Sequence, residues 1–464
     1  MTGDFMNKLI GSWSFYKKTL MIAVPIMIQN LITNFVALID NIMVGQVGTE
    51  QMTGVAIINQ LLFVFNLAVF GAVSGSGIFS AQFFGKGDRE GVRHTMRFKL
   101  ITAICICIIG VAVFIFFDDS LINMYLKGEA AGLDVAKTFQ SAKEYLAIML
   151  VGLVPFALEN VYSGTLREGG IATVPMYAGI VAVVTNTVLN ALLIFGLGPF
   201  PVMGVKGAAT ATVISRFIQS GIVVFWTHWN RNSLVYPKSL YRSLYVPKDL
   251  IKRISIKGLI PLTANECLWS LGIATLAACY SVRGVDVVAG QNISSTVVNL
   301  FNVLFIAFGS GVSVVIGQLL GANELEEARD AAPKLITFSV LLCVVVGSVM
   351  AIFAPLFPLM YKTTNAVRHL ATAFIIISAI WMPAHGMLHA TYFTLRSGGK
   401  TVITFFFDCG FSWCVSVPLA YCLATFTSLN IITIYFIVQS AELIKCVIGA
   451  ILIKKGVWLS NIVK

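Results

Sequence analysis

The chain has 464 residues, of which 57% are apolar and 11% are charged, and its formal net charge is +11. Soluble domains usually carry about 25% charged residues, and a soluble globule of this length still requires a polar surface. The composition therefore excludes an ordinary soluble protein and predicts an all-α integral membrane protein. Because the basic residues lie between apolar segments, they predict contact with anionic lipid and no nucleic-acid partner.

A membrane-spanning helix needs roughly 20 mainly apolar residues, and about twelve such stretches follow one another along the chain. They are expected at 20–44, 53–84, 98–117, 142–165, 172–195, 204–229, 253–280, 288–320, 334–360, 367–394, 401–424 and 428–454. The first run is too long for a cleavable signal and contains Asp40, so it is interpreted as a spanning helix. The nine cysteines lie almost entirely in apolar spans and predict neither disulfides nor a zinc site.

Lysine and arginine are concentrated in alternate connections between the spans, with the richest segment at 230–257. The positive-inside rule then puts both termini in the cytoplasm, and an even number of spans agrees with that orientation.

The chain repeats itself. A shift of 236 residues aligns Pro25 with Pro261, Gln82 with Gln318, and Gly85 with Gly321, and a shift of 229 aligns 165–170 with 394–399. Each half then holds six spans that enter from the same side, which predicts a parallel repeat about a pseudo-two-fold axis along the membrane normal. The expected domains are an N-lobe at 1–229, a cytoplasmic linker at 230–252 and a C-lobe at 253–464.

Acidic residues inside the spans are candidates for function, because inserting a charge there costs about 2.5–3.5 kcal/mol on insertion scales. Asp40 lies toward the end of the first span, whose polar side also carries Gln29, Thr33 and Asn34. Partial removal from water favours a neutral carboxyl group, which suits a proton carrier, whereas oxygen-rich neighbours would make Asp40 a ligand for a hard cation. A purely structural carboxylate at a helix end is the alternative.

Two amides in the fifth span, Asn186 and Asn190, are four residues apart and so share a helical face. Thr210 and Thr212 lie in the sixth span. These oxygens could complete a cation site with Asp40; the alternative is hydrogen bonding between helices, which is common for such residues in membranes.

Further polar residues in the spans are candidates for a substrate cavity or a proton relay. They are Asn34, Glu159, Asn160, Glu266, His385 and Asp408. Glu442 and His389 are embedded in the spans as well. His385 and His389 are one turn apart, a spacing that suits zinc, a proton relay or a structural pair. Arg216 is embedded as well and requires a counter-charge.

The chain has no phosphate-binding loop, so any uphill transport would use an ion gradient. Neither a cofactor nor a metal is expected, apart from a possible Na⁺ at Asp40.

Several motifs resemble the MATE (multidrug and toxic compound extrusion) transporters. The sequence DNIMVG at 40–45 is similar to the aspartate motif of the family's first helix, and AQFFGKGD at 81–88 and QLLGAN at 318–323 are similar to its glutamine–glycine motif. The leucine–arginine–glycine turns that begin at Leu166 and Leu395 match as well. The resemblance covers essentially the whole chain. It implies a two-lobed, twelve-helix exporter that trades Na⁺ or H⁺ for organic, often cationic, drugs.

The resemblance also implies roles for single residues. Asp40 matches the family's coupling aspartate, Asn186 its fifth-helix asparagine, and Thr212 a sixth-helix threonine. Asn190 stands where some members carry a second aspartate. Glu266 lies near a glutamate of NorM-like members, whose tenth-helix acid is replaced here by His385. These departures speak against a NorM-like cation site in the C-lobe and favour a DinF-like bacterial branch.

The leading interpretation is a monomeric, cation-coupled multidrug antiporter of the bacterial cytoplasmic membrane, with small organic substrates and the lipid bilayer as partners. The alternative is a flippase for lipid-linked oligosaccharides, which would need several cations in its cavity, where the sequence offers mainly Arg216. A membrane-embedded enzyme would need a denser constellation than His385 and His389 provide, so no enzyme is predicted. An ion channel fits a parallel repeat less well than alternating access does.

Overall fold

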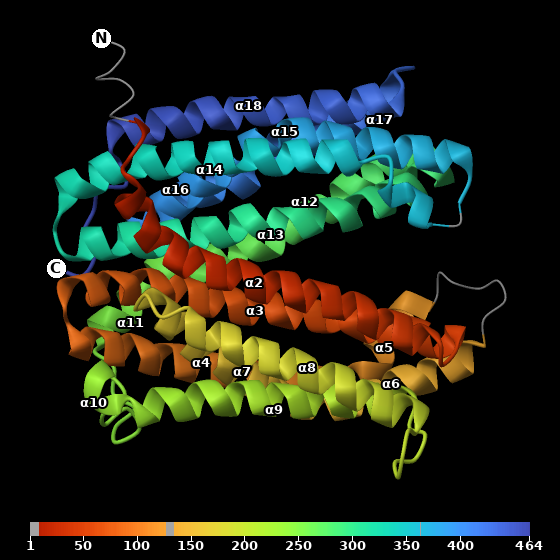
Figure 1. The fold of residues 1–464 in the computed structure, drawn as a ribbon, viewed down its shortest axis with the longest axis horizontal. Helices are drawn as coiled ribbons and strands as arrows, with labels where there is room; N and C mark the ends of the chain where they lie inside the picture. The colour runs from red at the N-terminus through yellow and green to blue at the C-terminus, as the bar shows by residue number, and fades with distance from the viewer. Residues whose placement is uncertain (1–8, 127–133, 362) are drawn as a thin grey trace. The chain divides into compact units, whose positions relative to one another are not determined.

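A computed structural model of the chain describes residues 9–126, 134–361 and 363–464, without the side chains of 36–38, 41 and 42. Within these residues the fold is built from helices and contains no strand (Figure 1). Ten helices are long and apolar enough to cross a membrane, and the bent pair α6–α7 can form an eleventh span. With α2, which has 33 residues, the helices account for the twelve spans expected from the sequence.

The helices follow the chain with short connections. Their bounds are α2 Trp13–Gly45, α3 Thr49–Lys86, α4 Arg89–Phe116, α5 Asp118–Leu126, α6 Val135–Val151, α7 Leu153–Glu168, α8 Thr173–Phe195, α9 Val205–Trp229, α10 Arg231–Leu234, α11 Lys248–Ile254, α12 Ile260–Ser281, α13 Val285–Gly321, α14 Leu325–Phe353, α15 Asn365–Ser397, α16 Thr401–Phe405, α17 Val417–Phe426 and α18 Ile431–Lys455.

Three of the expected spans are interrupted. The fourth is bent by 46° between α6 and α7, at Gly152, where an added Cβ would lie 3.0 Å from Val213. The seventh begins at Lys248 and passes through a π turn, Ser255–Leu259, before α12. The eleventh contains two π turns, Phe406–Gly410 and Ser412–Ser416, between α16 and α17. In the seventh and eleventh spans a proline follows the π segment, and proline has no N–H to continue the regular hydrogen-bond ladder.

The chain forms two compact units. Unit 1 comprises Met1–Met27, Ala81–Asp88 and Ile256–Lys464, and unit 2 comprises Ile28–Ser80 and Arg89–Ser255. In unit 1, α13 packs against α14 and α15, α15 against α18, and α12 against α17. In unit 2, α8 packs against α9, α9 against α6 and α7, and α4 against α7.

The glutamine–glycine motif shows why its glycines are required. An added Cβ on Gly85 would lie 1.9 Å from the Gln318 carbonyl oxygen, and one on Gly321 would lie 1.9 Å from the Gln82 carbonyl oxygen. The two copies of the motif, both in unit 1, therefore approach each other reciprocally, backbone against backbone. No residue with a side chain fits either position.

The C-terminal segment after α18 folds back onto this contact. Trp458 is 1% exposed, and the Gln82 side chain, fully buried, donates to the carbonyls of Ser397 (2.8 Å) and Ser460 (3.1 Å). The Gln82 oxygen accepts from the Ile462 N–H at 2.8 Å. Gln82 thus joins three segments of unit 1.

The segment between α10 and α11 is fixed to α4 through its backbone. Arg97 donates to the carbonyl oxygens of Ser239 (2.7 Å), Leu240 (2.9 Å) and Tyr245 (3.2 Å). Arg93 donates to the carbonyl of Tyr236 at 3.2 Å. Basic residues that the orientation rule counts simply as positive charges therefore also hold this connection in place.

Candidate cation site

The structure brings Asp40, Asn186, Asn190 and Thr212 together inside unit 2, from three helices. Asp40 comes from α2, the two asparagines from α8 and the threonine from α9. The Asn190 side-chain amide donates to Asp40 Oδ1 at 2.7 Å. Asn190 is 1% exposed and Asn186 is 7% exposed, so this contact is shielded from the surroundings of the helices.

Asn186 makes a second amide contact to the same carboxylate. With its nitrogen turned toward Asp40, Asn186 donates to Asp40 Oδ2 at 2.8 Å, and its oxygen accepts from the Thr212 backbone N–H at 3.3 Å. In the opposite orientation the amide oxygen would face the carboxylate oxygens, which repel it. Two amide donors therefore hold Asp40.

Small residues allow the three helices to approach so closely. An added Cβ on Gly207 would lie 2.6 Å from the Leu193 carbonyl oxygen, which shows that α9 lies directly on α8. Gly179 of α8 would similarly meet the Gln29 side chain of α2 at 3.0 Å. Glycine and alanine at such contacts let membrane helices pack backbone to backbone. The polar groups can then reach one another across the helix interfaces.

The arrangement suits reversible binding of a cation. Two N–H donors stabilise an ionised carboxylate, and both amides can rotate to present oxygen instead. The Asn190 Oδ1 atom is buried and has no hydrogen-bond partner among the described residues. Carboxylate, amide and hydroxyl oxygens are the ligands that hard cations prefer, and a proton on Asp40 would likewise require one amide to turn.

Other residues that the sequence nominated in this unit lie outside the cluster. Asn34 is exposed. Glu159 accepts a hydrogen bond from Ser163 at 2.7 Å, and the Asn160 amide donates within its own helix at 2.9 Å to the Phe156 carbonyl.

The positive charge of Arg216 is stabilised without an acidic partner. Among the described residues it forms no ion pair; it donates to the Gly152 carbonyl at 3.3 Å and lies 5.0 Å from the centre of the Phe156 ring. The expected counter-charge is therefore replaced by a carbonyl and an aromatic face.

In unit 1 the nominated residues form a second polar group. Asp408 accepts from the Asn265 amide at 3.3 Å and lies 3.5 Å from Lys445 Nζ. Glu266 interacts electrostatically with Arg396 and Asp408. Lys445 and Asn265 are absent from the sequence-based candidates. A single lysine in a strongly apolar span was the available signal for the first of them.

The histidine pair is held by a contact within its own helix and by an aromatic ring. No group of three or more His, Cys, Asp or Glu side chains in the described ranges is arranged to hold a metal ion. His389 Nδ1 lies 3.0 Å from the His385 carbonyl oxygen, and its ring packs 4.5 Å from that of Phe305. These contacts fit the structural interpretation of the pair.

Long apolar helices with a carboxylate clamped by amides in their interior define a polytopic membrane transporter. The MatE family model matches residues 25–192 and 261–422 of the chain. The chain belongs to this family, whose members are transporters and not enzymes. The two matches start 236 residues apart, which is the period found in the sequence.

Individual relatives agree along nearly the whole chain. "Probable multidrug resistance protein NorM" of Thermotoga maritima is 27% identical over 428 residues, covering 90% of this chain and 87% of the relative. "Probable multidrug resistance protein YoeA" of Bacillus subtilis is 24% identical, covering 91% and 90%. A solved structure described as the outward-facing conformation of a multidrug resistance MATE family transporter aligns with a TM-score of 0.84 at 20% identity, covering 95% of this chain and 96% of that one.

Proposed function

We propose that this protein is a cation-coupled antiporter that exports organic, often cationic, compounds across the bacterial cytoplasmic membrane. The names of the NorM and YoeA relatives support multidrug export. The observation that carries the coupling is the Asp40 carboxylate held between the amides of Asn186 and Asn190. Asp40 binds the driving ion, either a proton or Na⁺, and Asn186, Asn190 and Thr212 form the rest of the site.

The mechanism follows from the change in charge at Asp40. Without its ion, the carboxylate is negative and accepts both amide donors. When the ion binds, the charge is cancelled, and at least one amide turns its oxygen toward the site. Since α2 carries Asp40 and α8 carries both amides, ion binding favours one arrangement of these helices over the other. A ligand shifts a conformational equilibrium only through such a difference in free energy, and the lobes then alternate in access.

The remaining expectations belong to the same proposal. We propose that the protein works as a monomer. The distribution of lysine and arginine supports an orientation with both termini in the cytoplasm. Asn34, Glu159, Asn160, Glu266, His385 and Asp408 are candidates for contact with the substrate or for proton relay. The likeness to a DinF-like branch remains a sequence-based prediction.

The buried basic groups support this proposal over the flippase. Lys99 is paired with Glu168 at 2.5 Å, Lys445 lies between two carboxylates, and Arg167 donates to the Gln29 side chain at 2.7 Å. A site for a pyrophosphate-linked lipid would instead offer several cations to the ligand.

The test is transport of ethidium into proteoliposomes under an imposed Na⁺ or pH gradient. The wild type should move the dye under one of the two gradients, which identifies the coupling ion. Asp40→Asn, which keeps the side chain's size and removes its charge, should reduce transport to the level of protein-free vesicles. Asp286→Asn is the matched control, because Asp286 is exposed at the start of α13.

Two results would contradict the proposal. Gradient-driven transport that survives in Asp40→Asn removes Asp40 from coupling. A wild type that moves no organic cation under either gradient removes the antiporter assignment, and lipid-linked sugars would then be tested.

A further inference from the structure

A buried lysine in unit 1 lies between two carboxylates. Lys445 Nζ is 2.9 Å from Glu442 Oε2 and 3.5 Å from Asp408 Oδ1. The Asn265 amide donates to Asp408 Oδ2 at 3.3 Å, and the Ser416 hydroxyl donates to Glu442 Oε1 at 3.4 Å. We refer to Asn265, Asp408, Glu442 and Lys445 as the Lys445 cluster. It joins α12, the π-helical part of the eleventh span, and α18.

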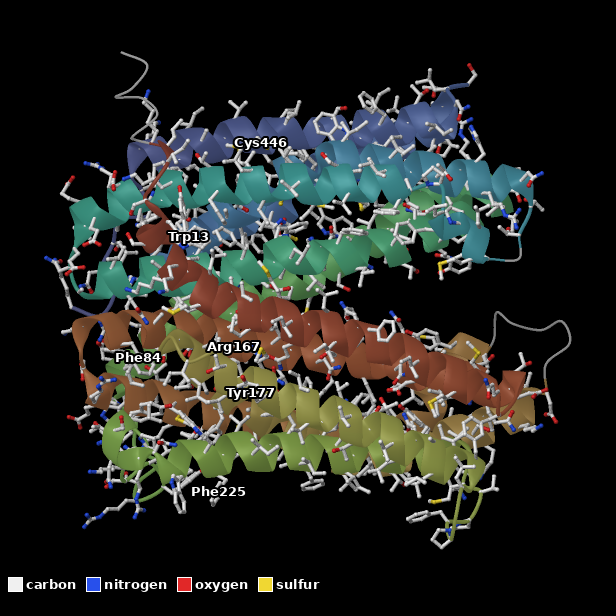
Figure 2. The ribbon with its side chains drawn as sticks, viewed as in Figure 1. Trp13, Phe84, Arg167, Tyr177, Phe225 and Cys446 are labelled. Carbon is white, nitrogen blue, oxygen red and sulfur yellow. The ribbon has the colours of Figure 1, made fainter. Side chains whose placement is uncertain are left out.

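The cluster lies on the inner face of α18. Apolar side chains on the opposite face are between 41% and 60% exposed; they are Leu443, Ile444, Val447, Ile448 and Ile451. Helical geometry places these five on one side and residues 442, 445 and 446 on the other. Figure 2 labels Cys446, the neighbour of Lys445, and so marks the position of the cluster along α18.

The charges of the cluster do not balance. Two carboxylates face one ammonium group, so the three ionised side chains sum to −1. Glu266 and Arg396, which interact electrostatically with each other, carry opposite charges that cancel when both are ionised. His385 and His389 also face the cluster and are neutral when unprotonated. Uncompensated charge away from water is unfavourable, and one added positive charge would complete the balance.

Two further features fit a cation at this place. Asn265 is 1% exposed, yet its Oδ1 atom has no hydrogen-bond partner in the part of the chain that the structure describes. That oxygen can accept an N–H or coordinate a cation. The rings of Phe411 and Phe407 have their centres 5.6 Å and 5.9 Å from Lys445 Nζ, and aromatic faces favour organic cations.

The two carboxylates are only partly buried. The Lys445 side chain is 8% exposed, that of Glu442 15%, and that of Asp408 24%. Asp408 therefore retains the most free surface, and it is also the carboxylate that lies farther from Lys445. An incoming cation would meet Asp408 first.

We propose that the Lys445 cluster binds the positive charge of a singly charged organic cation, and that Lys445 is a tethered counter-ion that limits the site to one such charge. The inference rests on the proposed export function for its class of ligand. Lys445 neutralises Glu442, and Asp408 with Asn265 Oδ1 receives the ligand. A doubly charged ligand would leave the site with an excess positive charge beside Lys445, which disfavours it.

Binding of two related dyes to purified protein in detergent tests this. Ethidium carries one positive charge, and propidium carries two on the same ring system. Four proteins form a series in the formal charge of the three ionised side chains: Lys445→Met (−2), wild type (−1), Lys445→Met with Glu442→Gln (−1), and Glu442→Gln (0). The control is Lys454→Met, the same change at an exposed position of α18.

The expected affinity for ethidium is highest in Lys445→Met, equal in wild type and the double variant, and lowest in Glu442→Gln. Each step in charge should change it on the order of tenfold, since the charges lie within a few ångströms of one another in a partly dry interior. The ratio of propidium to ethidium affinity should rise in Lys445→Met and return to the wild-type value in the double variant. Lys454→Met should bind both dyes as the wild type does.

The proposal is overturned if affinity does not follow the charge series, or if Lys454→Met shifts it as much as Lys445→Met does. If Lys445→Met fails to fold, Glu442→Gln and Asp408→Asn still test the proposal, because each must weaken ethidium binding. The assay needs no gradient, so it separates the two proposals. A flat charge series in a protein that transports overturns this inference alone, whereas a graded series without transport overturns only the antiporter.

Discussion

Lys99 and Glu168 form a buried ion pair between α4 and α7. Lys99 Nζ lies 2.5 Å from Glu168 Oε2 and 3.3 Å from the Thr165 hydroxyl, and Lys99 is 1% exposed. Glu168→Gln should destabilise the protein by about 3–5 kcal/mol, because it leaves the buried ammonium uncompensated. Thermal unfolding in detergent measures the effect. Replacing both partners, with Lys99→Met and Glu168→Gln, should recover much of the loss.

The control for this pair is Glu326→Gln, which removes a carboxylate that is 89% exposed and lies 3.7 Å from Arg329. Exposed ion pairs contribute little to stability. Equal midpoints of unfolding for Glu168→Gln and Glu326→Gln would show that the ion pair of Lys99 and Glu168 contributes no more to stability than an exposed pair does.

Residue spacing predicted some of these contacts and not others. The four-residue interval between Asn186 and Asn190 placed both amides on one face, and that face does meet Asp40. The orientation of the amides could not be predicted, because it depends on donors and acceptors from three helices. Lys445 gave little signal, since α18 has a mean hydropathy of 2.0 over its most apolar window and one lysine does not interrupt such a span.

The crossing of α3 and α13 depends on two glycines. Gly85→Ala or Gly321→Ala would drive a methyl group into a carbonyl oxygen 1.9 Å away. Such overpacking should cost about 1–3 kcal/mol or more, measured as a lower midpoint of thermal unfolding.

Gly221→Ala is the matched control for these two substitutions. No atom lies within 4 Å of the added Cβ at that position in α9. An alanine in an open helical position should be neutral or stabilise by up to about 1 kcal/mol. Gly85→Ala and Gly321→Ala should therefore lower the midpoint of thermal unfolding, whereas Gly221→Ala should leave it unchanged or raise it. An unchanged midpoint for Gly85→Ala would contradict the close approach of the two backbones at Gly85 and Gly321.

Helix locations followed from hydropathy, whereas the breaks within helices did not. The apolar runs located the spans because lipid requires long apolar segments. Hydropathy carries no information about backbone hydrogen bonding, so the π turns before Pro261 and Pro418 and the bend at Gly152 appear only in three dimensions. The break near Pro418 contains Asp408, a residue of the proposed cation-binding cluster.

At the scale of the whole chain, the two sequence repeats differ most in chemistry where they carry charge. Unit 2 holds Asp40 between amides, and unit 1 holds Asp408 and Glu442 around a lysine. The repeat was visible in the sequence because the glycine and glutamine positions are constrained by packing. Its chemical asymmetry depends on single residues such as Glu442, which the shift of 229 residues aligns with Val213.

The C-terminal segment connects positions that are far apart in the chain. Gln82 bonds to Ser460 and Ile462 at sequence separations of 378 and 380 residues, and Lys86 Nζ donates to the Val463 carbonyl at 2.9 Å. Trp458 is buried, and its backbone carbonyl lies against Gly398. Hydropathy gives no sign of this contact, since the segment is too short to span a membrane.

Trp458→Ala should therefore lower the stability of the protein by about 3–5 kcal/mol, the usual cost of truncating a buried aromatic side chain. Removal of residues 457–464 should lower it at least as much, because the hydrogen bonds to Gln82 and Lys86 are lost too. Trp13→Ala is the control, since Trp13 is 70% exposed. This variant should unfold at the same temperature as the wild type. Hydrogen exchange should also increase at 81–88 in the truncated protein. Unchanged exchange there would mean that the end of α3 is held by the Gly85–Gly321 crossing alone.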